Sequence, residues 1–272
     1  MSSPLRKASP WMAPRPAATT LVLRDGADGL EVLMVRRSLQ ASFMPGAYVF
    51  PGGAVDDADG DAAALSLLDE PVHRLTARMG AAAGVGGAIA AYAVAALREC
   101  FEECGLWLGA PPDAAARLPD LRRRLHGGTA LAEVARAGSL SLHTAALHPW
   151  SHWVTPVGAP KRFDTLFFVC AAPAGQVPEV DAGETTTLAW VRPEPALHAH
   201  RDGGFPMEFA TVATVRSLAP FGARPLAELL AHAAAQPALP ALHPRLRLDE
   251  QGHILGVLMP GEPGYEQLAG DG

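Results

Sequence analysis

The stretch Arg98-Glu99-Cys100-Phe101-Glu102-Glu103-Cys104-Gly105-Leu106 carries most of the information about the fold of this chain. Its three glutamates stand at positions i, i+3 and i+4, a spacing that places them on one face of a helix. The pattern predicts a helix over residues 88–104, ended by Gly105 in the left-handed conformation. Phe101 and Cys104 fall on the opposite face, so we expect an amphipathic helix with acid on one side only.

Repulsion among the carboxylates on this helix face predicts that a cation binds there. Like charges at this spacing destabilise a helix by about a few tenths of a kcal/mol per pair, and Arg98 offsets only part of that cost. Carboxylate oxygens select hard ions, so Mg²⁺ or Mn²⁺ is expected rather than zinc. Spacing alone leaves the alternative of a solvated acidic face open.

Length and composition narrow the class of protein. A chain of 272 residues with 49% hydrophobic residues can bury a sizeable core, and no linker divides it, so we favour one α/β domain with additions. With 22 basic and 28 acidic residues the net charge is −6, which excludes a general nucleic-acid binder. The apolar run at 79–97 consists mostly of alanine and glycine, so no membrane span is predicted.

The cysteines and histidines are expected to be structural. Cys100, Cys104 and Cys170 are too few for a disulfide framework, which favours buried thiols and a cytoplasmic location. No signal peptide and no peroxisomal terminal address are recognised, and a homodimer is among the assemblies open to the protein. The histidines are scattered and are expected at the surface rather than on zinc; they include His148, His152, His198 and His200.

The order of predicted elements follows from periodicity and turn residues. A hairpin is predicted from the β-rich runs 19–24 and 31–37, and a short strand at 48–50. Residues 62–87 are interpreted as a surface insertion, partly helical. The remaining predictions are helices at 113–126, 129–137 (with Thr129 as N-cap), 207–218 and 226–235, strands at 150–155, 162–170 and 185–191, and a hairpin within 246–258. The chain thus divides into a flexible tail (1–16), a main domain (17–235, insertion about 60–90) and an extension (236–272).

Residues 98–106 resemble the helical half of the Nudix box. The loop half resembles Gly53 to Asp59, with Asp59 where the family has its first glutamate, and 38 residues rather than seven separate Asp59 from Arg98. The approach to the box, from Arg37 to Phe50-Pro51-Gly52-Gly53, is similar to coenzyme A diphosphatases of that family, although Ser42 stands where their motif has a second arginine. The likeness extends over roughly residues 19–221.

This resemblance implies a fold and an activity. The expected fold is α/β, a Nudix-like α/β/α sandwich around a mixed sheet, with a helical insertion and extra C-terminal helices. The implied activity is metal-dependent hydrolysis of the diphosphate of coenzyme A or acyl-coenzyme A, giving adenosine 3′,5′-bisphosphate and (acyl-)4′-phosphopantetheine. Two alternatives are kept: hydrolysis of ADP-ribose or another nucleoside diphosphate derivative, and an inactive Nudix-like binding module.

The resemblance also implies roles for particular residues. Glu99, Glu102 and Glu103 would hold Mg²⁺ or Mn²⁺, and Arg98 would orient a carboxylate in the catalytic group. Glu184 is the candidate for a further catalytic base or ligand, with Glu179 and Asp181 as competitors. The candidate substrate-binding residues are Arg36, Arg37, Phe43, Gly52, Gly53, Lys161, Arg162 and Phe163.

Overall fold

A mixed sheet lies at the centre of the computed structural model, which describes residues 12–40, 45–80, 83–180, 185–268 and 270. Strand β1 (Arg15–Gly26) pairs in parallel with β6 (Phe163–Ala171) and antiparallel with β2 (Gly29–Arg37). The other strands of this seven-stranded sheet are β3 (Tyr48–Val49), β4 (Gly52–Ala54), β5 (His148–Val154) and β7 (Thr185–Val191). Because β4 pairs with β1 beyond the end of the β1–β2 pairing, it places the two glycines of the box at the side of β1.

The hairpin of β1 and β2 confirms the prediction from the two β-rich runs. Its register joins Leu23 to Val32 and Gly26 to Gly29. Gly29 has a φ of 116°, a conformation that side chains rarely adopt, so glycine is needed at this turn. The strand β1 already begins at Arg15, inside the predicted tail.

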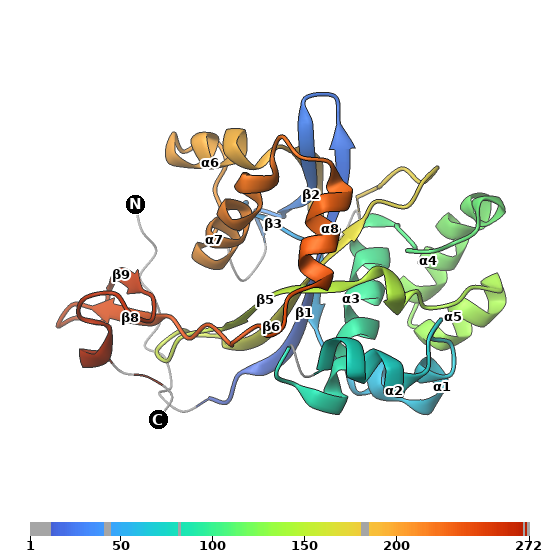
Figure 1. The fold of residues 1–272 in the computed structure, drawn as a ribbon, viewed down its shortest axis with the longest axis horizontal. Helices are drawn as coiled ribbons and strands as arrows, with labels where there is room; N and C mark the ends of the chain where they lie inside the picture. Colours follow the sequence, from blue (N-terminus) through green and yellow to red (C-terminus); the bar gives the residue numbers. More distant parts are fainter. Residues whose placement is uncertain (1–11, 41–44, 81–82, 181–184, 269, 271–272) are drawn as a thin grey trace.

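The helix α3 (Ile89–Cys104) covers one face of the sheet together with α1 (Ala62–Leu65), α2 (Val72–Leu75), α4 (Leu118–His126) and α5 (Leu131–Gly138) (Figure 1). Ala93 and Ala96 are fully buried, and their small side chains let the helix lie close to β1, where Thr20 Oγ1 donates to the Ala96 carbonyl at 2.9 Å. Gly105 follows at a φ of 71°, so the predicted helix and its end are confirmed. Amphipathicity is less simple than predicted, because Arg98 and Glu103 are buried as well.

The opposite face of the sheet is covered by three helices, α6 (Pro193–Arg201), α7 (Phe209–Leu218) and α8 (Leu226–Ala234). A second apolar cluster forms there, with Leu21 and Met34 of the sheet packed against Leu229 of α8. Helix α6 was not among the predicted elements, although Pro193 at its first turn is a typical helix start. With helices on both faces of a mixed sheet, the predicted α/β/α sandwich is confirmed.

The insertion is partly helical and lies at the surface, as predicted, but a few of its residues pack into the apolar core. It contains α1 (Ala62–Leu65), α2 (Val72–Leu75) and two further short turns. Leu75, Met79 and Ala83 are at most 1% exposed and belong to the same apolar cluster as α3. Their spacing of four residues puts them on one side of the chain, so they bury their side chains against α3.

Between α3 and β5 the chain forms α4 (Leu118–His126) and α5 (Leu131–Gly138), preceded by a 3-10 turn (Pro112–Arg117). Both predicted helices are therefore present. The prediction of Thr129 as N-cap was wrong, because Ala130 occupies that position and no side chain caps α5. The Thr129 N–H instead belongs to the turn after α4, where it donates to the Arg124 carbonyl at 3.1 Å.

A separate hairpin, β8 (Arg245–Leu248) and β9 (Ile254–Leu258), confirms the late hairpin and lies away from the helices (Figure 1). Tyr265 closes it, since its hydroxyl donates to the His243 carbonyl at 2.6 Å. Among the described residues, no helix combines the length and apolar character that crossing a membrane requires.

Candidate active site

The two glycines of β4 lie against the last two turns of α3. Gly52 N donates to Glu103 Oε2 at 3.1 Å. A Cβ added at Gly53 would lie 2.4 Å from Glu99 Oε1, so any larger residue would require that carboxylate to move. Gly53 therefore allows close approach of β4 to the helix, whereas a Cβ at Gly52 would meet β1; the predicted role of both glycines in substrate binding stays a prediction.

Asp59 and Arg98 form a buried bidentate ion pair although 38 residues separate them. The guanidinium Nε and Nη2 atoms each lie 2.9 Å from one of the two carboxylate oxygens, and Asp59 is 2% exposed. The same Nη2 donates to the Ala54 carbonyl at 2.9 Å, directly after the glycines. The two halves of the interrupted motif thus meet in space, and the insertion loops out between them.

Arg98 also contacts the acidic face of its own helix. Its Nη1 donates to Glu99 Oε1 at 2.7 Å and to Glu102 Oε2 at 3.2 Å. One guanidinium therefore faces the carboxylates of Asp59, Glu99 and Glu102, and its role of orienting a carboxylate for catalysis stays a prediction.

Burial shifts the titration of these glutamates. It raises the pKa of Glu99 to about 7, against the opposing effect of Arg98. Burial likewise raises the pKa of Glu102, again partly offset by Arg98. Both carboxylates hold their negative charge at a free-energy cost, which a nearby cation would reduce.

The donor set suits a hard divalent cation. Glu99, Glu102 and Glu103 supply oxygen ligands only, and the single Arg98 does not balance their charge together with that of Asp59. As arranged, no three Asp, Glu, His or Cys side chains of the described residues are grouped so that they could hold a metal ion. The carboxylates instead face Arg98 and the Gly52 amide, so the predicted metal site remains a prediction that the donor chemistry favours.

The arginines that end β2 lie near the loop leading to these glycines. Arg36 Nε donates to the Gly46 carbonyl at 3.2 Å, and its guanidinium lies over the ring of Tyr48. Arg37 N donates to the Ala47 carbonyl at 3.0 Å, and the residue is half-buried. Phe43, the other predicted contact in this region, lies outside the described residues.

Of the two basic residues predicted to bind substrate just before β6, one is exposed and the other is buried. Lys161 is exposed, whereas Arg162 is 5% exposed and donates to the carbonyls of Thr155 and Met12, each at 3.0 Å. Phe163 is half-buried and pairs with the first residue of β1, Arg15. Their roles in substrate binding remain predictions, but the contacts of Arg162 are those of a structural residue.

Of the three candidate general bases that follow β6, the structure describes only Glu179. Glu184 and Asp181 lie outside the described residues. Glu179 is exposed, and its backbone N donates to the Cys104 carbonyl at 2.9 Å, at the end of α3. The segment that precedes β7 is thus bonded to the end of the glutamate helix.

Of the remaining predictions, the buried thiols are confirmed and one histidine is corrected. Cys100 and Cys104 are fully buried, and burial raises the pKa of Cys100 to about 12. His152 was predicted at the surface but is 6% exposed and bonded through Nε2 to Asp164. Both residues stand on sheet strands, β5 and β6, where the face toward the helices is covered.

Two basic residues that contact the glutamate helix were missed. Arg122 and His126 of α4 both bond to the Glu102 carbonyl. In the sequence they belong to an ordinary basic helix, and no local pattern distinguishes them from their exposed neighbours.

Comparison with known proteins places these features in a family. Residues 5–208 match the family described as NUDT19 Nudix domain. Two similar proteins are both named acyl-coenzyme A diphosphatase NUDT19. The one from Gallus gallus is 31% identical over 66% of this chain, and the one from Homo sapiens is 29% identical over 71% of it. The chain spans 61% of the length of each of these relatives.

A solved structure supports the fold. A NUDIX hydrolase from Alicyclobacillus acidocaldarius is 30% identical, with a TM-score of 0.60. The match covers 76% of this chain and 92% of that one. The sandwich described above is therefore shared along almost the whole of that structure.

Proposed function

This chain belongs to the Nudix hydrolase family, and on that premise we propose that it hydrolyses the diphosphate bond of coenzyme A or acyl-coenzyme A with the help of a divalent cation. The products would be adenosine 3′,5′-bisphosphate and (acyl-)4′-phosphopantetheine. The observation that carries the proposal is the buried pair of Asp59 and Arg98. It joins the two halves of an interrupted box and leaves Glu99 and Glu103 beside the glycines of β4.

The proposed chemistry assigns the cation to Glu99, Glu102 and Glu103. Mg²⁺ or Mn²⁺ bound there would neutralise diphosphate oxygens and lower the pKa of a water molecule. Arg98 holds the carboxylates of Glu99 and Glu102 by hydrogen bonds from a single guanidinium nitrogen, and Asp59 in turn fixes the guanidinium. Glu184 remains our candidate for the general base.

Two points favour coenzyme A as the substrate class. The named relatives are acyl-coenzyme A diphosphatases. In addition, an acidic chain needs local positive charge to bind so anionic a substrate, and Arg36 and Arg37 supply it at the end of β2, next to β3. Ser42, which departs from the family motif, lies outside the described residues.

The test is a comparison of purified wild type, Glu103→Gln and Glu133→Gln on coenzyme A and on ADP-ribose, with and without Mg²⁺, followed by mass spectrometry of the products. The amide side chain of the Glu103→Gln variant keeps an oxygen that can accept from Gly52 N but loses the charge. Glu133 is an exposed glutamate of α5 and serves as the matched control. We expect Mg²⁺-dependent cleavage of coenzyme A that Glu103→Gln lowers by about 10²-fold or more and Glu133→Gln leaves unchanged.

The other outcomes separate the alternatives. Cleavage of ADP-ribose in preference to coenzyme A would replace the substrate class but keep the chemistry. Cleavage of neither, with metal supplied, would favour a binding module. Full activity of Glu103→Gln would show that the metal site is misplaced.

A further inference from the structure

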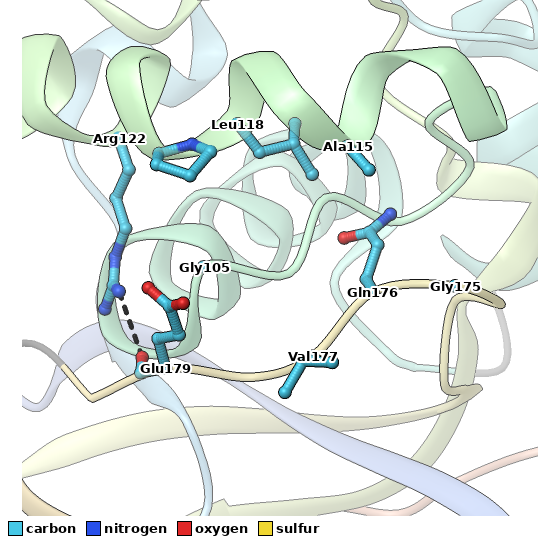
Figure 2. A pocket seen from close by; sticks show the side chains of 9 residues that line it. Gly105, Ala115, Leu118, Arg122, Gly175, Gln176, Val177 and Glu179 are labelled. Carbon is cyan, nitrogen blue, oxygen red and sulfur yellow. Dashed lines mark hydrogen bonds between the residues drawn. The ribbon is translucent and has the colours of Figure 1, made fainter.

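Arg122 of α4 bonds to the backbone at the end of the glutamate helix. Its Nε and Nη2 atoms both donate to the Glu102 carbonyl, at 2.8 and 2.6 Å. Its Nη1 donates to the Glu179 carbonyl at 3.0 Å, as the dashed line in Figure 2 shows. Arg122 is 8% exposed, so this guanidinium is buried together with the carbonyl groups that it satisfies.

Arg122 binds a carbonyl group of the last turn of α3, which cannot be satisfied within the helix. The last carbonyls of a helix have no partner within the helix. Here the Glu102 carbonyl is taken by Arg122 and contacted by His126 Nε2 at 3.0 Å, and the Cys104 carbonyl accepts from Glu179 N at 2.9 Å. A positive charge at this end also interacts favourably with the helix dipole.

A cavity adjoins the last turn of α3 on the side of Arg122. This cavity of about 170 Å³ is lined among others by Gly105, Arg122 and Glu179 (Figure 2). Gly105 has no side chain to fill it, and a Cβ there would lie 3.4 Å from Arg122 Nη1. At this point the hydrogen bonds to Arg122 add to the apolar packing of the helix end, where Phe101 and Cys104 are buried in the main apolar cluster.

We propose that Arg122 is a positioning residue for the proposed hydrolysis, on which this inference rests. Glu102 is held at its side chain by Arg98 and at its carbonyl by Arg122. Glu103 follows directly and reaches Gly52 N with its carboxylate. Loss of the Arg122 bonds frees the last turn to fray or rotate, and both carboxylates then lose their orientation toward β4 and toward a cation.

The experiment uses the full chain and the variants Arg122→Met, Arg122→Lys and Arg123→Ala. Arg123 is the neighbouring, exposed arginine, which pairs only with Asp120 among the described contacts. For each variant we would measure the melting temperature, the affinity for Mn²⁺ alone by electron paramagnetic resonance, and kcat and KM on coenzyme A with Mg²⁺. We expect Arg122→Met to weaken Mn²⁺ binding and lower kcat by about 10-fold or more each, with little change in KM, because groups that orient metal ligands typically contribute this much.

The controls decide between positioning and plain structural support. Arg122→Lys should recover part of both losses, and Arg123→Ala should match wild type. A folded Arg122→Met that melts earlier but keeps wild-type Mn²⁺ affinity and kcat would overturn the inference. If Arg122→Met does not fold, the same measurements are made on Arg122→Lys. Wild-type Mn²⁺ affinity and kcat in that variant would then overturn the inference. A wild type that neither binds Mn²⁺ nor cleaves coenzyme A would overturn the proposed function, and the inference with it.

Discussion

The two glycines of β4 make different contacts, and substitution of each by alanine should show it. Neither has a positive φ, so alanine is not strained by its backbone conformation at either site. At Gly52 the new Cβ would lie 2.5 Å from the Ala18 carbonyl oxygen and 2.8 Å from Thr19 Cα, both of which belong to the backbone of β1. At Gly53 the new Cβ would instead meet the carboxylate of Glu99 at 2.4 Å.

The size of each effect follows from what must move. A backbone clash such as that of Gly52→Ala typically destabilises by about 1–3 kcal/mol. Gly53→Ala can be accommodated if Glu99 swings away, which breaks its 2.7 Å hydrogen bond to Arg98. A hydrogen bond to a charged group contributes about 1.5–3 kcal/mol, so we expect a loss of that order. In a Glu99→Ala background the obstacle is gone, and Gly53→Ala should then cost close to nothing.

The assay is a double-mutant cycle measured by urea unfolding. We compare the free energy of unfolding for each glycine variant with and without Glu99→Ala. Gly53→Ala should couple to Glu99→Ala by about 1.5–3 kcal/mol, whereas Gly52→Ala should cost the same in both backgrounds. Gly53→Ala should also lower kcat on coenzyme A by about 10²-fold, because displacement of a reacting group by 1 Å has effects of this size. Equal costs of Gly53→Ala in both backgrounds would refute the placement of Glu99 against β4.

Four further predictions use the same site and its surroundings. Asp59→Asn should destabilise the protein by about 3 kcal/mol in urea unfolding, because it leaves Arg98 buried with one ionic partner fewer, and a loss below about 1 kcal/mol would contradict this. In metal-free protein with chelator, the pKa of Glu99 near 7 means that the folded state holds a proton that the unfolded state loses above about pH 4.5. The Glu99 carboxyl should therefore make stability fall between about pH 4.5 and 7, by up to about 3 kcal/mol, and Glu99→Gln should remove this part and leave the part due to Glu102, whose pKa is also raised; an unchanged slope would count against the shift. Arg36→Ala should raise KM for coenzyme A by about 10-fold and lower the melting temperature only slightly, through loss of the bond to the Gly46 carbonyl. Arg162→Met should lower the melting temperature and leave KM alone, and steady-state kinetics showing the reverse would make Arg162 the substrate ligand.

Several elements could be predicted because they depend on residues close in sequence. The hairpin of β1 and β2 follows from two β-rich runs around a turn that ends at Gly29, whose φ of 116° needs glycine. The glutamate helix follows from its spacing and from Gly105 as its end. The resemblance of Gly52-Gly53 and residues 98–106 to the Nudix box likewise depends on residue types within short sequence segments. In each case neighbours within a few residues set the backbone conformation.

The tertiary structure alone decided what the insertion does and what holds the site together. Leu75 and Met79 are buried against α3 although their segment looked like surface, and Asp59 returns to Arg98 across 38 intervening residues. Arg122 reaches the Glu102 carbonyl from another helix, with nothing in its own surroundings to mark it. Closing a loop of this length has an entropic cost that only packing and buried ion pairs across the fold can offset. Local sequence thus determined which helix carries the glutamates, and long-range contacts decided which residues hold them in place.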